Sequence, residues 1–256
     1  MIVMDDVRFS YGKTEVIHGM SFSSEPNTII SILGPNGTGK TTFLKCMCGV
    51  FKPSSGKITV DDMDISELKG RDLAKKIAFV PQSVPVSKMS VFDSILIGRK
   101  PYIEWGASES DIDKVSDIID ALGMGHLALK YLDEISGGEF QKVQIARAIV
   151  QEPSVLVLDE PTNNLDIANQ HKAMRMISEA VRSRGMCTIM TMHDINLAVH
   201  YSDKFLFVKN GRTVAYGGTE VITEELIKDV YDMDADVISH RGIPMVVPRE
   251  SDRYME

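Results

Sequence analysis

One segment restricts the possible folds of this chain more than any other: GPNGTGKTT, at residues 34–42. It follows the apolar run at residues 28–33 and precedes a helix predicted at residues 41–48. Its glycines allow the backbone to wrap closely around an anion, and the N-terminal end of the following helix adds partial positive charge. A strand, this loop and a helix in that order predict a P-loop, which grips the phosphates of a nucleotide.

Two side chains of this loop have separate predicted tasks. Lys40 would lie along the β- and γ-phosphates, and the hydroxyl of Thr41 would complete a Mg²⁺ shell that includes phosphate oxygens. An ordinary glycine turn is the alternative, and the strand before the loop and the helix after it argue against that alternative. The nucleotide-binding residues predicted in this segment are Gly34, Pro35, Asn36, Gly37, Thr38, Gly39, Lys40, Thr41 and Thr42.

Two adjacent carboxylates follow a second apolar run, at residues 155–158. Ligands collect at the C-terminal edges of parallel strands, where Asp159 and Glu160 would lie. We expect Asp159 to hold the Mg²⁺ shell, directly or through water, and Glu160 to polarise a water for in-line attack on the γ-phosphate. A pair that merely caps a strand is the alternative, which the P-loop in the same chain disfavours.

A second glycine-rich element, at residues 135–139, leads into a helix predicted at residues 140–150. Ser136 and Glu139 fit a capping box, which by itself explains the motif structurally. Gly137 and Gly138 also leave backbone N–H groups open to an anion, so the element is a second potential phosphate site. If the two sites lie on separate subdomains, one chain cannot bring both to one nucleotide. A head-to-tail homodimer is then the economical solution.

The remaining pattern indicates an α/β fold. Alternating residues at 3–9 and the run at 57–60 predict an antiparallel sheet near the start of the chain. Continuous apolar runs at 155–158 and 187–191, with a helix from about 166 to 184 between them, predict buried parallel strands. Asn210 and Gly211 predict a β-hairpin.

Residues 90–150 interrupt this pattern with helical periodicity, which predicts an inserted helical subdomain. Ser90 with Asp93, and Ser108 with Asp111, fit capping boxes at two helix starts. The apolar residues expected along one helix face are Ile112, Val115, Ile118, Ile119 and Leu122. The fold class predicted is thus an α/β P-loop core with a parallel sheet, an N-terminal antiparallel β subdomain and a helical insert.

Composition limits the classes of function. With 256 residues, 43% hydrophobic and 25% charged, the chain is long and apolar enough to be globular. No apolar stretch approaches the length of ~20 residues that spans a bilayer, and the N-terminus has no signal-peptide pattern. We therefore expect the chain to stay in the cytoplasm. A net charge of −8 gives no footprint for nucleic acid. Cys46, Cys48 and Cys187 include no CxxC pair, which favours reduced, buried thiols.

Four motifs together carry a family resemblance: GPNGTGKTT, ISGGEFQKVQIARAI, VLVLDEPTNNLD and TMHD, in this order and at these separations. They resemble the Walker A, signature, Walker B with D-loop, and switch-histidine motifs of ABC ATPase subunits, over essentially the whole chain. The resemblance implies one ABC ATPase domain at residues 1–256, with a nucleotide-binding core and β subdomain at 1–85 and 151–218. The helical subdomain with the signature motif would occupy 86–150, and a C-terminal tail 219–256.

The resemblance implies roles for further residues. Tyr11 would stack on adenine, Gln82 would sense Mg²⁺ and the attacking water, Asp166 would link the two sites of the dimer, and His193 would contact the γ-phosphate. Taken singly, Tyr11 fits a strand aromatic, Gln82 a surface amide and His193 a polar residue at a helix start; the ordered set of motifs decides against these alternatives. Glu139 stands where the family commonly has Gln. The helix start should survive this change, but the added charge would weaken ATP-driven closure.

The resemblance also implies a function. SVFDSILIGRKPY at 90–102 and VYDMDADVISHRGIPMVVP at 230–248 are similar to the ATPases of iron–siderophore, haem and cobalamin importers. Such a chain hydrolyses ATP with Mg²⁺ as a homodimer on the cytoplasmic face of the membrane, beneath permease subunits and opposite a solute-binding protein. A soluble scaffold ATPase of the iron–sulfur assembly kind and a non-hydrolysing module are the alternatives. The presence of both Lys40 and Glu160 disfavours a non-hydrolysing module.

Three aromatic residues bear on partners. Phe92 has capped-helix spacing and is expected to fill the helical subdomain. Tyr102 and Trp105 follow Gly98 and Pro101 on a predicted loop, where large aromatics often contact partners. In a transporter they would line the groove that receives a coupling helix of the permease.

Overall fold

The computed structural model describes residues 1–163 and 165–249. Asn164, in the VLVLDEPTNNLD motif, and residues 250–256, at the end of the predicted tail, lie outside the described residues. Near the start of the chain is an antiparallel sheet with strand order β2-β1-β4-β5. Its strands are β1 (Ile2–Tyr11), β2 (Thr14–Ser23), β4 (Ser55–Val60) and β5 (Met63–Asp64). The predicted antiparallel sheet is therefore confirmed.

A second sheet of six strands has the order β10-β9-β3-β8-β7-β6. Five neighbouring strands run parallel, and β10 pairs antiparallel with β9 through the predicted hairpin at Asn210 and Gly211. All residues of β3, β7 and β8 are buried, as their unbroken apolar runs predict. The strands are β3 (Ile29–Leu33), β6 (Ile77–Val80), β7 (Val155–Asp159), β8 (Cys187–Thr191), β9 (Lys204–Lys209) and β10 (Arg212–Gly217).

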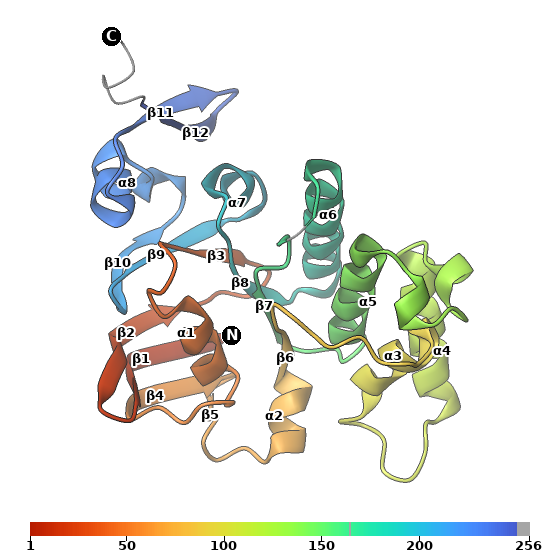
Figure 1. Ribbon diagram of the computed structural model, residues 1–256. Coiled ribbons are helices and arrows are strands. Elements are labelled where there is room, and N and C mark those ends of the chain that lie inside the picture. The colour runs from red at the N-terminus through yellow and green to blue at the C-terminus, as the bar shows by residue number, and fades with distance from the viewer. Residues whose placement is uncertain (164, 250–256) are drawn as a thin grey trace.

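Alternate residues of the central strand β3 contribute to two different cores. Ile30 and Ile32 pack with the antiparallel sheet and with α1 (Lys40–Met47), which lies between the two sheets. Ile29 and Leu33 belong to the core that includes α5 (Gly137–Ile149), α6 (Ile167–Arg184) and α7 (Ile195–Tyr201). Figure 1 shows α1 beside β1 and β2, with α5 and α6 beyond β7. The parallel sheet is thus covered on both faces.

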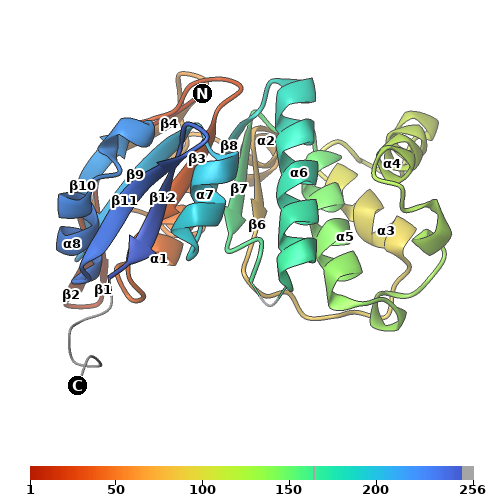
Figure 2. The same cartoon turned by 90° about the horizontal axis from the view of Figure 1, so that it is seen from above.

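The helical part gathers on one side of the molecule, away from β1 and β2 (Figure 2). Its elements are α3 (Val91–Leu96), η1 (Ile97–Arg99), α4 (Glu109–Ala121), η2 (Gly125–Leu127), η3 (Leu132–Glu134) and α5. Phe92 packs against the core, as expected. Ser90 caps α3, but Asp93 bonds the Ser90 hydroxyl and not its backbone N–H, so the first predicted box is only half formed. The box of Ser108 and Asp111 is complete.

The predicted inner face of α4 is wrong at Ile112, which is 42% exposed. Asp111, the residue before it, is buried instead, because its carboxylate pairs with Arg99 inside the protein. The inward stripe of α4 is therefore Asp111, Val115, Ile118 and Ile119, with Leu122 partly buried against the same core. The buried stripe thus includes a charged residue paired with Arg99, which a purely apolar pattern does not identify.

The remaining elements are a helix before β6 and the elements that follow β10. The locally basic stretch before β6 forms α2 (Gly70–Lys76), a helix that has no buried residue. After the core come η4 (Thr219–Val221), α8 (Glu224–Tyr231) and a hairpin of β11 (Ala235–His240) and β12 (Ile243–Pro248). Asn196 of α7 holds this hairpin through two hydrogen bonds with the backbone of Val246. Every helix of the described ranges 1–163 and 165–249 is too short or too polar to cross a bilayer.

Candidate functional site

The glycine-rich loop after β3 has the backbone geometry that an anion-binding loop requires. Gly34 has φ 153°, and a Cβ there would lie 2.1 Å from the carbonyl oxygen of Val208. Gly37 and Gly39 have φ of 79° and 92°, a region that side chains disfavour. Because Gly39 is the N-cap of α1 and has no side chain, the first N–H groups of the helix face the loop.

Lys40 lies at the centre of this loop. Its ammonium donates to the carbonyl oxygens of Gly34 at 2.6 Å and Pro35 at 2.8 Å, and the residue is 6% exposed. Burial lowers the pKa of Lys40, while the carboxylates of Glu160 and Asp159 oppose the shift. The loop therefore holds a buried ammonium group near two carboxylates. The negative charge of a bound phosphate chain would neutralise this ammonium group.

Asp159 is held by hydroxyl groups on both sides. Its Oδ1 accepts from Thr191 Oγ1 at 2.7 Å and from Thr41 Oγ1 at 3.2 Å. Parallel pairing of β7 and β8 places Thr191 beside Asp159. A hydroxyl and a carboxylate at one point form the hard oxygen donor set that Mg²⁺ prefers, with its remaining positions left to water and phosphate. The residues present thus fit a magnesium ion.

Glu160 is the centre of a second cluster. Its φ of 52° turns the chain sharply at the end of β7, so its side chain points away from that of Asp159. Its carboxylate accepts from Gln82 Nε2 at 2.5 Å and contacts His193 Nε2. Asn163 Nδ2 also donates to it, at 3.1 Å.

These side chains come from the ends of three adjacent strands. Gln82 follows β6, Glu160 follows β7 and His193 follows β8, and the three strands are neighbours in the sheet. The sequence-predicted catalytic residues Gln82, Glu160 and His193 therefore meet at one edge of the sheet. Of the three, Gln82 and His193 contact Glu160, and Glu160 lines one hollow of about 210 Å³ together with Lys40. The residues lining it are Val16, Asn36, Gly37, Gly39, Lys40, Thr41, Thr42 and Glu160.

A larger cavity, of about 440 Å³, lies between α6, α7 and the C-terminal hairpin. It is lined by His171, His200 and Arg241 among others, and contains neither Lys40 nor Glu160. The smaller hollow is the better candidate site because it gathers the glycine-rich loop, the Lys40 cation and the carboxylate that is predicted to act as general base.

Tyr11 ends β1 near this hollow. Its hydroxyl lies 3.3 Å from Thr42 Oγ1, and its ring packs edge-on against Phe9 and Phe51 while remaining 49% exposed. It is therefore both a strand aromatic and an exposed ring beside the P-loop helix. Stacking on adenine stays a prediction.

The second glycine-rich element forms the expected helix cap. Ser136 accepts from the backbone N–H of Glu139, and the Glu139 carboxylate accepts from the Ser136 backbone N–H at 2.8 Å. The Ser136 hydroxyl also donates to the Glu139 carboxylate, at 2.7 Å, and this bond, followed by that of the Ser136 backbone N–H, holds the pKa of Glu139 below its usual value. In the described part of the chain, this element contributes no residue to the lining of the hollow around Lys40. Its residues are Ser136, Gly137, Gly138 and Glu139. The second predicted phosphate site is therefore not part of the hollow in its own chain.

Asp166 and Tyr102 make hydrogen bonds within the single chain, whereas Trp105 is exposed. Asp166 caps α6 and accepts from the backbone N–H of Asn169 at 2.9 Å. Trp105 is 100% exposed, as expected of a partner contact. Tyr102 differs, because its hydroxyl donates to the carbonyl oxygen of Gln151 and its ring lies on Arg99. Their predicted roles toward a second chain or a permease stay predictions.

Sequence reasoning missed Thr191, Asn163 and Val16 at the site. Thr191 is the most informative of them, since its hydroxyl bonds Asp159 and accepts from the backbone N–H of Glu160 at 2.9 Å. A signal for it existed. Two apolar strands ending in Asp159 and in Thr191 would align in a parallel pair, which brings these polar ends together.

Comparison with known proteins gives matches along most of the chain. Residues 17–163 match the family described as ABC transporter. An uncharacterised ABC transporter ATP-binding protein of Methanocaldococcus jannaschii is 46% identical, over 97% of this chain and 98% of its own. The petrobactin import ATP-binding protein of Bacillus subtilis is 33% identical, over 91% and 93%. The hemin import ATP-binding protein of Thermobifida fusca is also 33% identical, over 93% and 85%.

A solved structure agrees with these relatives. A chain from a metal-chelate type ABC transporter in an inward-facing conformation superposes with a TM-score of 0.85 at 27% identity, covering 97% of both chains. The match includes the helical part and the C-terminal elements as well as the two sheets. The predicted fold class is confirmed.

Proposed function

The chain belongs to the ABC transporter family, and from this premise we propose that it binds Mg²⁺-ATP in the hollow around Lys40 and hydrolyses it to power import. The observation that carries the proposal is that Glu160, which contacts Gln82 and His193, lines the same hollow as Lys40. Such a constellation suits in-line attack of a water on a terminal phosphate.

Each side chain has a task that follows from its contacts. Lys40 and the loop N–H groups bind the phosphates, and Tyr11 covers the base. Glu160 accepts the proton of the attacking water, because its carboxylate is anchored at the strand end and faces the hollow. Gln82 and His193 orient that water and the γ-phosphate through their shared contact with Glu160.

Thr41 and Asp159, with Gln82 at the rim, are the residues that would hold Mg²⁺. The ion neutralises charge on the phosphate oxygens when bound. Thr191 keeps the Asp159 carboxylate in place for it.

The second half of the proposal is a homodimer that closes around ATP. Ser136, Gly137, Gly138 and Glu139 lie outside the hollow of their own chain, so they are free to meet the nucleotide held by a second copy. Asp166, at the start of α6, would then link the two sites. The Glu160→Gln variant keeps the phosphate-binding residues and should form this dimer with ATP. Size-exclusion chromatography at high protein concentration tests it, and a monomer at saturating ATP would count against the dimer.

We further propose that the dimer works on the cytoplasmic face of a membrane beneath a permease that imports a metal chelate. The support is the similarity to petrobactin and hemin import ATP-binding proteins and to a metal-chelate type transporter. Iron–siderophore, haem and cobalamin are the candidate solutes, delivered by a solute-binding protein on the far side. Trp105 and Tyr102 would contact the permease, and the full exposure of Trp105 supports this role.

Co-purification from native membranes tests this assignment. Recovery of a many-span permease with the chain supports import, and recovery of soluble assembly proteins instead contradicts it. Uptake of labelled iron chelate, haem and cobalamin into vesicles holding the complex then ranks the solutes, with molybdate as the control. The expected result is ATP-dependent uptake of one of the first three.

A further inference from the structure

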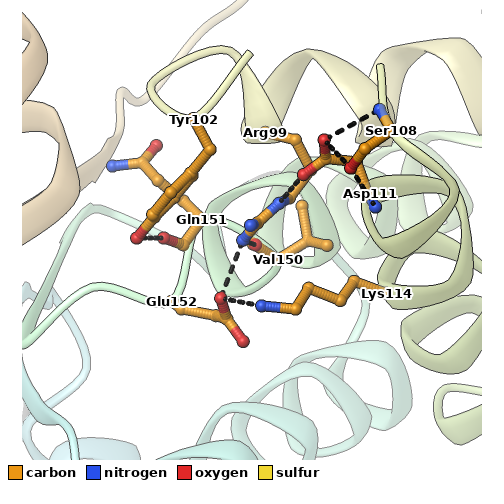
Figure 3. Close-up of polar contacts among 8 residues, drawn as sticks. All are labelled: Arg99, Tyr102, Ser108, Asp111, Lys114, Val150, Gln151 and Glu152. Carbon is orange, nitrogen blue, oxygen red and sulfur yellow. Dashed lines mark hydrogen bonds and ion pairs between the residues drawn. The ribbon is translucent and has the colours of Figure 1, made fainter.

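A buried arginine joins the elements on either side of the exposed loop that carries Trp105. Arg99, at the end of η1, is 4% exposed. Its Nε donates to Asp111 Oδ1 at 2.9 Å, and its Nη1 donates to the carbonyl oxygen of Val150 and to Glu152 Oε2, both at 2.8 Å. Figure 3 shows the guanidinium at the centre of these contacts. One side chain thus bonds α4, the C-terminal end of α5 and the segment that returns to the core.

The charges around Arg99 are balanced. Asp111 and Glu152 supply two carboxylates, while Arg99 and Lys114 supply two cations, with Lys114 Nζ 2.6 Å from Glu152. Hydrogen bonds from Ser108, followed by the pairing with Arg99, hold the pKa of Asp111 below its usual value. Arg99 and Asp111 are buried, whereas Glu152 and Lys114 are partly exposed. The buried pair has a defined geometry, because moving one member leaves the other unpaired.

Tyr102 extends this cluster to the exposed loop. The Arg99 guanidinium lies 4.0 Å from the centre of the Tyr102 ring, and the Tyr102 hydroxyl donates to the carbonyl oxygen of Gln151 at 3.1 Å. The Gln151 amide in turn donates to the carbonyl oxygen of Ile77 at 2.9 Å, at the start of β6. Arg71 of α2 donates to the carbonyl oxygen of Ile103 in the same loop.

Gly98 lies where η1 packs closely against α5. A Cβ there would lie 2.2 Å from the carbonyl oxygen of Arg147, so η1 packs directly on the last turn of α5. α5 begins at the signature motif and runs for 13 residues to this contact, so its two ends belong to one continuous helix. β7 comes after Gln151 in the chain, and β6 begins at Ile77, which Gln151 contacts. Gln82 follows the end of β6, and Glu160 follows the end of β7.

We propose that Arg99 and Tyr102 are positioning residues that couple the loop carrying Trp105 to both nucleotide-facing ends of the fold. One end is the signature motif at the start of α5, and the other is the pair Gln82 and Glu160 at the ends of β6 and β7. The inference rests on the proposed function, because it takes the hollow around Lys40 as the ATP site. A partner that presses on the loop would then shift both ends together.

The chain provides its own reporter for the test. Trp105 is its only tryptophan, so its fluorescence quenching by iodide measures the exposure of the loop alone. We compare the quenching constant with and without ATP, in the absence of Mg²⁺ to prevent turnover, and measure the Kd for ATP in the same samples by calorimetry. Tyr102→Phe removes one hydroxyl and keeps the ring. Arg99→Lys keeps the charge and loses the planar fork.

The exposed Arg175 of α6 provides a matched control, Arg175→Lys. We expect ATP to change the quenching of Trp105 in the wild type and in this control. In Tyr102→Phe and Arg99→Lys that change should shrink by about fivefold, the scale of one lost hydrogen bond, while the Kd for ATP stays within about threefold.

The outcomes separate the two hypotheses. If ATP does not bind the wild type, the proposed function fails. If ATP binds but Trp105 quenching is unchanged in the wild type, or changes equally in all variants, the coupling inference is overturned. Should Arg99→Lys fail to fold, Tyr102→Phe alone decides, since it deletes only a partly exposed hydroxyl.

Discussion

Thr191→Val removes a hydroxyl that holds both acidic residues of the site, and the structure gives the size of the effect. The Thr191 hydroxyl donates to Asp159 and accepts from the backbone N–H of Glu160, and the residue is fully buried. A hydrogen bond to a charged group contributes about 1.5–3 kcal/mol, and a buried N–H left without a partner costs about 1–3 kcal/mol. Valine has nearly the same shape, so no cavity adds to this. The free energy of unfolding should fall by about 3–4 kcal/mol.

The same strand provides a matched control, Thr188→Val. Thr188 is equally buried, but its Oγ1 has no hydrogen-bond partner among residues 1–163 and 165–249. Removing it should change the free energy of unfolding by less than about 1 kcal/mol, and in the stabilising direction. Urea unfolding followed by circular dichroism measures both variants, with the m-value expected to stay constant.

Activity gives the second readout of this pair of variants. Thr191→Val frees the backbone at Glu160, whose φ of 52° places the carboxylate, so turnover should fall by about tenfold or more while Thr188→Val turns over normally. If Thr191→Val is no less stable than Thr188→Val, the reasoning about this hydroxyl is refuted.

Three further predictions concern the loop, the helical junction and the helix cap. Lys40→Ala should raise the Kd for ATP, measured by calorimetry, by about tenfold to a hundredfold, because a charge-assisted contact with phosphate is lost; unchanged affinity would contradict the P-loop role. Gly98→Ala places a methyl group 2.2 Å from the backbone of Arg147 and should destabilise by about 1–3 kcal/mol in urea, whereas Gly106→Ala, with open space among the described residues, should be neutral. The pKa of Glu139 is lowered by the hydrogen bonds of the helix cap, so the stability it provides is present above its unfolded pKa and lost as pH falls through the folded pKa. Glu139→Gln should therefore flatten the acid side of the stability–pH curve, and a curve identical to that of the wild type would argue against the cap bond.

Features that depend on neighbouring residues were predictable from the sequence. The loop at residues 34–42, the caps at Ser108 and Ser136 and the hairpin at Asn210 are confirmed because each is specified within a few residues. The buried strands at 155–158 and 187–191 are also confirmed, since a strand covered on both faces must be apolar throughout.

Features that depend on distant pairs were not predictable. Ile112 was expected to be buried because it is apolar, but the buried partner of Arg99 is the polar Asp111. The hydrogen bond of Tyr102 is of the same kind, because its hydroxyl reaches Gln151, a residue close only in the folded chain. The division into core, helical subdomain and tail, and the contacts with nucleotide, second chain and permease, stay predictions.

The central claim is that Glu160 is the general base of an ATPase site. The most direct test is the rate of phosphate release by the wild type and by Glu160→Gln at saturating Mg²⁺-ATP, with the Kd for ATP measured on both. We predict that the two bind ATP equally and that turnover of the variant is reduced about a hundredfold or more, the scale of losing a general base. Equal rates of phosphate release would contradict the account.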